Sequence, residues 1–345
     1  MKIIVVGKGL AGHGVIESLV RKIGNNEIEC LWLGPEMSLD NQKAWGPCSL
    51  NSTALVSLHG IQKGVSPLGN LLTDSFYATK KFLETHNAEG VEKCYRLHLG
   101  TNGKEEEKIF NRFGSLESLT LKERTFSGFK EEAFQIHPIN FFKWWDNRLS
   151  QICHFKLRKD SQLALSLDSE KKLIRTQSGI EPFDKLIIAT GALGLDLKLK
   201  RECRLKQKSE GKKVVGHFFR KELERPYQLG EKSFIVTLDG QNLIYNASEK
   251  LLTLGGSNQG DGPIAPDLEA IKKQQELFIK TFPEWHQELK FRSDHLYTGV
   301  RYKAPRRMPF ARLYNNDIGE VNGFYKNGWT LTHFLSDSLI SEILK

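Results

Sequence analysis

Residues 3–12 have the sequence IIVVGKGLAG, in which four apolar residues precede three glycines spaced G-x-G-x-x-G. An uninterrupted apolar run is typical of a parallel strand that is covered on both faces. In this motif Gly7 permits the tight turn out of the strand, Gly9 lets the backbone approach a pyrophosphate, and Gly12 lets the next helix pack closely. Its position between a predicted strand and a predicted helix favours dinucleotide binding over a merely structural turn. The expected cofactor contacts are Gly7, Gly9, Leu10, Ala11 and Gly12.

The residues after the motif predict the rest of a βαβ unit. Apolar residues recur at helical spacing from Val15 to Ile23, and residues 28–33 form a second apolar run. An acidic residue normally ends this second strand and holds the adenosine ribose. Leu33 is followed by glycine, so the candidate is the nearest acid, Glu36. The alternative is that Glu36 is an exposed loop residue and that backbone groups hold the ribose.

A second small-residue turn follows another apolar strand. Residues 186–188 are Leu-Ile-Ile, and Ala189-Thr190-Gly191 come next. Small residues at Thr190 and Gly191 let the chain pass close to a nucleotide that lies across the strand ends. Together the two turns favour FAD over NAD as the cofactor.

The remaining pattern predicts the fold class. Apolar spacing predicts helices over 66–85, 139–152, 266–282 and 329–344, and strands near 95–99, 119–121, 234–238 and 251–254. Residues 100–107 are expected to form a loop. We therefore expect an α/β fold, with a discontinuous Rossmann-type FAD-binding domain made from residues 1–80, 134–196 and 296–345. Residues 81–133 and 197–295 are expected to form an α+β substrate domain built on a mostly antiparallel sheet.

Composition predicts a soluble protein. The length of 345 residues suggests about two domains, and no stretch reaches the roughly 20 apolar residues of a membrane span. No signal-peptide pattern is present at the N-terminus. No CxxC pair occurs, so neither a metal site nor a disulfide framework is indicated, and a cytoplasmic location is expected. The cysteines are Cys30, Cys48, Cys94, Cys153 and Cys203.

The formal charge is +9, and basic residues crowd positions 198–225. A smaller cluster holds Lys303, Arg306, Arg307 and Arg312. The simpler interpretation is a solvated face. The alternative is attraction of an acidic substrate, RNA or an anionic membrane surface. No RNA-binding motif with interleaved aromatic residues supports a nucleic-acid partner.

The order of these signals resembles the D-amino-acid-oxidase-like flavoproteins, which include glycine and sarcosine oxidases and hydroxy-acid dehydrogenases. Besides GKGLAG, the resemblance rests on CSLNSTALVSLHGI (48–61), IHP (136–138), DKLIIATGALG (184–194), LLTLGGSNQGDG (251–262), TGVRYKAPRRMPFARL (298–313) and NGFYKNGWTLTHFLSDSLISEIL (322–344). It implies FAD, and it places Ser49, Ser52 and Thr53 beside the pyrophosphate and the flavin. It also implies that Arg301, in the family's G-x-R strand, binds a substrate carboxylate, for which a guanidinium fork is suited. The alternative for Arg301 is a structural bridge between the two domains.

Several further site residues are predicted near the flavin. Asn327 and Gly328 precede a helix whose positive end, with Trp329 and Thr330, would stabilise negative charge on the reduced flavin. The alternative is a surface helix that merely packs on the sheet. Lys326 would stabilise the anionic reduced flavin or assist oxygen reduction, or else it is solvated.

Three other residues carry weaker predictions. His59 would act as a base or as a hydrogen-bonding neighbour of the site. Tyr302 would line the substrate pocket or serve in packing. Cys48 would tether the flavin or, more simply, be a small buried thiol.

The resemblance implies hydride transfer to flavin N5 from a small amine or amino acid that is anionic because it carries a carboxylate. O2 or another acceptor would then reoxidise the flavin. Alternatives are a 2-hydroxy-acid dehydrogenase, a tRNA-modifying flavoprotein oxidase that uses the basic segment, and a flavin-binding protein without turnover. The last arises because the bulky Phe324, Tyr325 and Trp329 replace the glycine-rich stretch that relatives carry before the final helix.

Overall fold

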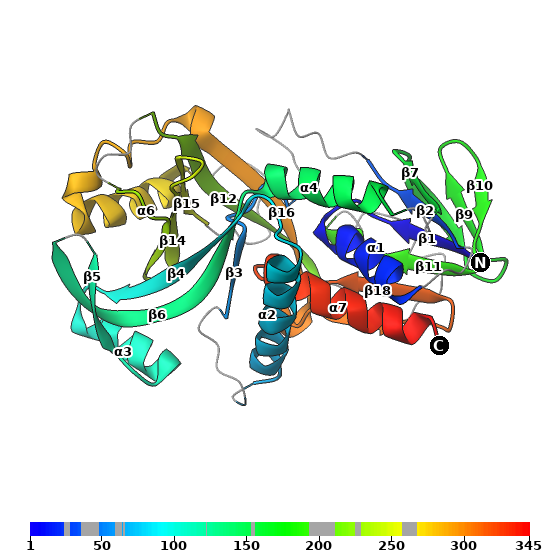
Figure 1. The fold of residues 1–345 in the computed structure, drawn as a ribbon, viewed down its shortest axis with the longest axis horizontal. Helices are drawn as coiled ribbons and strands as arrows, with labels where there is room; N and C mark the ends of the chain where they lie inside the picture. Colours follow the sequence, from blue (N-terminus) through cyan, green and yellow to red (C-terminus); the bar gives the residue numbers. More distant parts are fainter. Residues whose placement is uncertain are drawn as a thin grey trace.

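The computed structural model describes residues 1–23, 28–35, 48–58, 64, 66–121, 123–152, 156–192, 211–224, 229–256 and 268–345, with the side chain of Ala270 excepted. The described chain forms two large sheets side by side, with both termini at the end that carries β1 (Figure 1). Among the described residues, no helix combines the length and apolarity needed to cross a membrane.

The N-terminal motif lies in a six-stranded sheet of the described chain, with strand order β17-β18-β11-β1-β2-β7. All neighbours pair in parallel except β17 with β18. This is the order of a Rossmann-type sheet, with β1 in its centre. The bounds are β1 Lys2–Val6, β2 Glu29–Leu33, β7 Lys156–Asp160, β11 Lys185–Ile188, β17 Phe310–Leu313 and β18 Ile318–Asn322.

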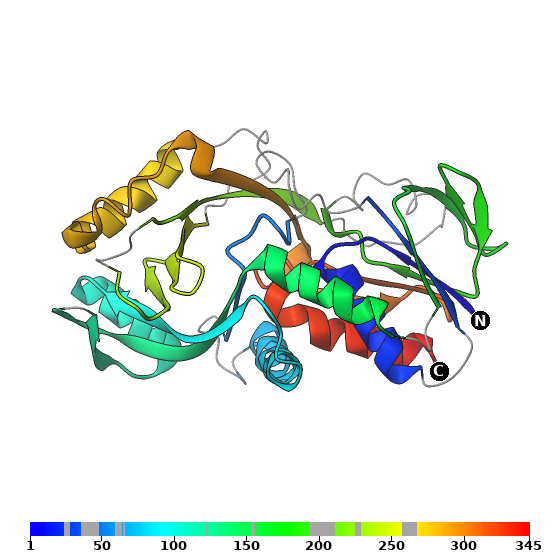
Figure 2. The ribbon, with the colours of Figure 1, turned by 45° about the horizontal axis from the view of Figure 1, so that its top comes forward.

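The alternation of side chains along β1 divides this core into two layers. Ile3 and Val5 pack with the helices α1 (Leu10–Lys22), α4 (Pro138–Ser150) and α7 (Gly328–Ile343). Ile4 and Val6 face the other way, toward a small sheet of β8 (Ala164–Asp168), β9 (Leu173–Thr176) and β10 (Ile180–Pro182). Because both faces are covered, the strand needs the continuous apolar run that the sequence has. Figure 2 shows the three helices together on one side of the sheet.

The second sheet has nine strands within the described residues. Its order is β16-β12-β15-β14-β13-β4-β6-β3, with β5 also paired to β6, and only β4 and β13 pair in parallel. One face is covered by α6 (Leu268–Thr281), through residues such as Ile271 and Phe278. The bounds are β3 Leu55–Ser57, β4 Val91–Gly100, β5 Glu117–Leu121, β6 Arg124–Ile136, β12 Lys212–Glu222, β13 Phe234–Leu238, β14 Gln241–Asn246, β15 Leu251–Gly255 and β16 Leu296–Lys303.

These two sheets confirm the predicted fold class, a Rossmann-type domain with a mostly antiparallel second sheet. The helix predicted over 66–85 is α2 (Pro67–Thr85), which packs against α7. Short 3-10 helices occupy Pro283–Trp285, Ser293–His295 and Pro305–Arg307. Two strands, β3 and β16, lie in chain segments that the sequence assigned to the FAD-binding domain, yet they pair in the nine-stranded sheet. The domain boundaries themselves stay a prediction.

The loop predicted over residues 100–107 is wrong, because α3 (Gly103–Phe113) begins there. The Asn102 side chain accepts a hydrogen bond from Glu105 N at 3.1 Å and caps the helix. The Glu105 carboxylate in turn accepts from Thr101 N at 2.9 Å, and Gly114 ends the helix in the left-handed region at φ 78°. The polar composition suggested a loop, but capping by Asn102 and Gly114 stabilises a helix in this polar segment.

Replacing Asn102 with alanine should weaken α3 by about 0.5–2 kcal/mol, because the Glu105 N–H then loses its side-chain acceptor and keeps only the Asn102 carbonyl oxygen. Hydrogen exchange of the α3 amides should accelerate several-fold. Lys104→Ala, an exposed change in the same helix, is the matched control and should leave exchange unchanged. Equal acceleration in both variants would show that the cap contributes nothing.

Candidate functional site

The turn between β1 and α1 is packed so tightly that two of its glycines admit no side chain. Gly7 has φ +115°, and a Cβ atom there would lie 2.3 Å from the carbonyl oxygen of Ala189 at the end of β11. A Cβ atom on Gly12 would lie 1.9 Å from the carbonyl oxygen of Gly7. Gly7 N also donates to Leu33 O at 2.7 Å, at the end of β2. The ends of three strands and the start of α1 are thereby fixed together.

Gly9 differs from the other two glycines, because its Cβ position is open. The nearest atom is Ser49 Oγ, at the ordinary contact distance of 3.6 Å. The same hydroxyl accepts a hydrogen bond from Leu10 N at 3.1 Å, in the first turn of α1. No acidic residue lies in that first turn, so no side chain of the turn itself offsets the partial positive charge at the start of the helix. Gly9, Leu10, Ala11 and Ser49 therefore form an edge that suits an anionic group.

The turn after β11 leaves a polar atom unused. Thr190 Oγ1 is buried and has no hydrogen-bond partner among the described residues. Gly191 has φ +57°, and nothing lies within 4 Å of its Cβ position. Its carbonyl accepts a hydrogen bond from Asn322 Nδ2 at 3.1 Å, which fixes the turn to β18. A buried hydroxyl without a partner usually marks a place for a ligand or a water molecule.

The start of α7 reaches the start of α1. Gly328 lies beside Leu10, whose Cδ2 is 3.5 Å from the Cβ position of Gly328, and no side chain caps the helix at Asn327. The indole of Trp329 packs on Phe141 and Phe142 and donates its Nε1–H to Ser52 Oγ at 2.9 Å. This indole is therefore a packing group in the core, not a wall exposed on the site.

Two buried hydroxyl interactions hold the first turn of α7 in place. Thr330 Oγ1 donates to Ser57 O at 3.4 Å, and Thr330 O accepts from Thr79 Oγ1 at 2.9 Å. These contacts tie α7 to β3 and α2. Thr53 lies between Ser52 and β3 and is half-buried.

A corner rich in positive charge lies around Arg301 on β16. The Arg301 guanidinium lies over Gly216, where a Cβ atom would be 2.5 Å from Nη2, and it hydrogen-bonds the Cys48 side chain. Burial raises the pKa of the Cys48 thiol, and Arg301 opposes that rise. Burial, Arg301 and Arg307 together lower the pKa of Lys326 to about 8. In the described part of the chain Lys326 and Arg307 form no ion pair, so no carboxylate there neutralises these two charges.

Tyr302 is not brought together with Arg301. Neighbouring residues of a strand point to opposite faces, and the Tyr302 hydroxyl accepts a hydrogen bond from Gly211 N at 3.2 Å. The ring lies 6.3 Å from the Phe310 ring. The structure thus favours the packing interpretation of Tyr302. Glu36 and His59 lie outside the described residues, as do most of the basic residues at 198–225.

Arg220 was missed by the sequence analysis, which grouped it with a solvated basic segment. That interpretation is wrong for this residue, since Arg220 is only 8% exposed. Its Nη2 donates to Ser52 O at 2.7 Å, so it contacts the loop that also carries Ser49. The sequence does contain a signal for this burial. Arg220 is two residues from Phe218, and in a strand two such side chains share one face.

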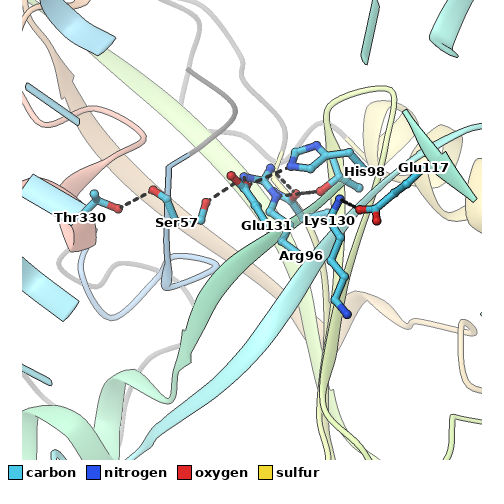
Figure 3. A network of polar contacts seen from close by, with 9 residues as sticks. Ser57, Arg96, His98, Glu117, Lys130, Glu131 and Thr330 are labelled. Carbon is cyan, nitrogen blue, oxygen red and sulfur yellow. Dashed lines mark hydrogen bonds and ion pairs between the residues drawn. The ribbon is translucent and has the colours of Figure 1, made fainter. Parts of the chain in front are cut away.

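A second polar cluster, which the sequence did not predict, lies on β4 and β6 (Figure 3). Arg96 donates to Ser57 Oγ at 3.1 Å and to Thr237 Oγ1 at 2.9 Å, and forms an ion pair with Glu131 at 3.3 Å. His98 Nε2 lies 3.0 Å from Glu131 Oε1, and burial is the main cause that lowers the pKa of His98 to about 4. The charged groups of this cluster are hydrogen-bonded to one another. Its contact with Ser57 also stabilises β3, whose Ser57 carbonyl accepts from Thr330 at the start of α7. No group of three His, Cys, Asp or Glu side chains in the described chain is arranged to hold a metal ion.

Lys326 is expected to titrate near pH 8, well below the ordinary value of 10.5. Between those two pH values the folded state binds fewer protons than the unfolded state. The contribution of Lys326 to the free energy of unfolding therefore increases as the pH rises from about 8 to 10.5. NMR of ¹³C-dimethylated lysines can measure the pKa, with Lys326→Met identifying the signal.

Arg301→Met should raise the pKa of Lys326, because it removes a neighbouring positive charge. An unchanged value in that variant would contradict the proximity of the two groups.

No protein-family model and no curated protein sequence matches the chain. Solved structures do match it along almost its whole length. Glycine oxidase from Geobacillus kaustophilus has a TM-score of 0.77 at 13% identity, covering 99% of this chain and 94% of that one. Iminodiacetate oxidase from Chelativorans sp. BNC1 has a TM-score of 0.75 at 14% identity, covering 99% and 95%.

A third match is the dithionite-reduced L-α-glycerophosphate oxidase from Mycoplasma pneumoniae with FAD bound. It has a TM-score of 0.71 at 13% identity, covering 100% of this chain and 94% of that one. Identities this low establish the fold alone. The chain has the fold of the D-amino-acid-oxidase-like oxidoreductases, as the sequence resemblance implied.

Proposed function

We propose that the protein is an FAD-dependent oxidoreductase that removes a hydride from a small amine or amino acid carrying a carboxylate. The observation that carries the proposal is the position of two neighbouring residues. Cys48 contacts the Arg301 guanidinium, and Ser49 accepts from Leu10 N at the start of α1. Adjacent Cα atoms are about 3.8 Å apart, so the carboxylate-binding group and the dinucleotide turn belong to one site.

The residues present fit FAD. The backbone N–H groups at Gly9, Leu10 and Ala11 would hold the pyrophosphate at the positive end of α1. Thr190 Oγ1, buried without a described partner, would gain a ligand acceptor, and the open space at Gly191 admits a nucleotide beside it. The first turn of α7, at Asn327 and Gly328, would face the flavin ring. When bound, FAD supplies the hydride acceptor, its N5 atom.

The protein's own groups bind and orient the substrate. Arg301 binds the carboxylate through a fork of two N–H donors, which fixes the direction of the substrate C–H. Lys326, with a pKa of about 8, is mostly protonated at neutral pH and stabilises negative charge in this corner. The Arg301 side chain is 7% exposed, so its bond to a carboxylate is formed largely out of water and is correspondingly strong.

The similar structures support the same substrate class. Two are named for the oxidation of glycine and of iminodiacetate, which are both amines that carry carboxylates. A third contains FAD. The electron acceptor, O2 or another oxidant, and a cytoplasmic location remain parts of the proposal.

Gly9, whose Cβ position is open, and Gly12, whose Cβ position is blocked, give a direct test of FAD binding. Gly9→Ala places its methyl group where only Ser49 Oγ is near, so the free protein should keep its stability. The methyl group would occupy the approach of the pyrophosphate, and FAD affinity, measured by visible absorbance or calorimetry, should fall at least about tenfold.

Gly12→Ala is the matched comparison. It forces a methyl group against the carbonyl of Gly7 and should lower the free energy of unfolding by about 1–3 kcal/mol. FAD affinity that is unaffected in Gly9→Ala would count against a pyrophosphate at this turn.

Arg301→Met should leave FAD bound, as its visible spectrum would show, and raise KM for a carboxylate-bearing amine by about 30-fold or more. Arg301→Lys, which keeps a charge but not the fork, should recover part of the loss. Equal KM values in wild type and Arg301→Met would refute the role given to this residue.

A further inference from the structure

Arg220 and Arg301 lie on the same face of the nine-stranded sheet. Gly216, Phe218 and Arg220 occupy every second position of β12 and therefore share one face, and Gly216 pairs with Gly299 of β16. Arg301 is two residues from Gly299, and its guanidinium lies over Gly216, so it shares that face. The rings of Phe218 and Tyr297 stack at 5.3 Å farther along the same face, next to Arg220.

The contacts of Arg220 use only part of its guanidinium. Nε donates to Thr253 Oγ1 at 3.5 Å, and Nη2 donates to Ser52 O at 2.7 Å. The group has five N–H donors, so the edge that carries Nη1 is left without an acceptor from the described chain. The Cζ atom lies 4.9 Å from the centre of the Phe218 ring and 5.6 Å from that of Tyr297.

All of these partners are uncharged. A buried guanidinium is normally paired with a carboxylate, as Arg96 is with Glu131 on the same sheet. Arg220 has no such pair in the described residues, and its burial lowers its pKa to about 10. Two aromatic faces and two neutral oxygens hold the side chain in place but do not neutralise its charge. An anionic group from a ligand would do so.

The loop at residues 48–52 joins the two arginines. Cys48 contacts Arg301, and Ser52 O contacts Arg220, with Ser49 between them on the start of α1. Four peptide units span at most about 14 Å, so both guanidinium groups lie along one short segment of the site. That spacing suits the two ends of a single small molecule.

We propose that Arg220 binds a second carboxylate of the substrate, so that the preferred substrate is an amine with two acidic groups. This inference rests on the proposed function, since it takes Arg301 as the residue that binds the first carboxylate. Arg220 is then a specificity-determining residue, with the Phe218–Tyr297 pair as the apolar wall between the two charged ends.

Unreactive acids of matched length test the proposal by calorimetry on the FAD-saturated protein. Wild type should bind glutarate at least about tenfold more tightly than pentanoate, and Arg220→Met should remove this preference while pentanoate binds as before. Arg301→Met should weaken both acids. Lys221→Met is the matched control, because Lys221 lies on the opposite face of β12 with Nζ on Lys290 O at 2.7 Å; it should change neither affinity.

Two results would overturn the inference: equal affinity of wild type for the two acids, or an equal loss of both acids in Arg220→Met, which would mean that Arg220 only supports Ser52. Arg220→Gln, which can still donate to Ser52 O, replaces Arg220→Met if the latter loses FAD. Failure of the wild-type protein to bind FAD would instead refute the proposed function. That outcome is visible in the spectrum before any acid is added.

Discussion

The loop at residues 48–54 is the constraint on which the candidate site depends, because it is bonded to both large sheets. Ser49 Oγ accepts from the start of α1, and Asn51 Nδ2 donates to Thr298 O of β16 at 2.9 Å. The fit at β16 is close, since a Cβ atom on Gly299 would lie 2.3 Å from Asn51 O. The loop therefore sets the distance between the edge that suits a diphosphate and the face that carries the arginines.

Charge is treated differently at the two ends of that face. The Arg96 cluster has its own carboxylate and hydroxyl partners, so burying it leaves no unmet requirement. At the other end, the positive charges of Arg301 and Arg307 both lie close enough to Lys326 to lower its pKa. Like charges gathered in a partly buried place repel one another, and a bound anion would offset this repulsion. Such an arrangement is common where binding, not stability, has shaped the residues.

The sequence predicted what depends on neighbouring residues and missed what depends on strand pairing. The β1 turn, α1, α2 and the end of β11 follow from local spacing, and the structure confirms these elements. Arg96, His98 and Glu131 meet only because β4 pairs with β6, and nothing in the local sequence around each residue indicates that pairing. The environment of Arg220 was missed for the same reason, because its partners Ser52 and Thr253 are far away in the sequence. The roles of Arg301 and Lys326 stay predictions, as do those of Glu36 and His59.

The nine-stranded sheet takes its strands from widely separated parts of the chain, from β3 near residue 55 to β16 near residue 300. The six-stranded sheet likewise needs β18 beside β11, and α7 closes its core at the C-terminal end. Neither sheet can be completed before its last strand, β16 or β18, has been synthesised. Pairing between strands so far apart in the sequence gives a high contact order, so the sheets close slowly and their strand edges stay exposed meanwhile. Partly folded states with exposed strand edges are prone to aggregation, and this topology prolongs them.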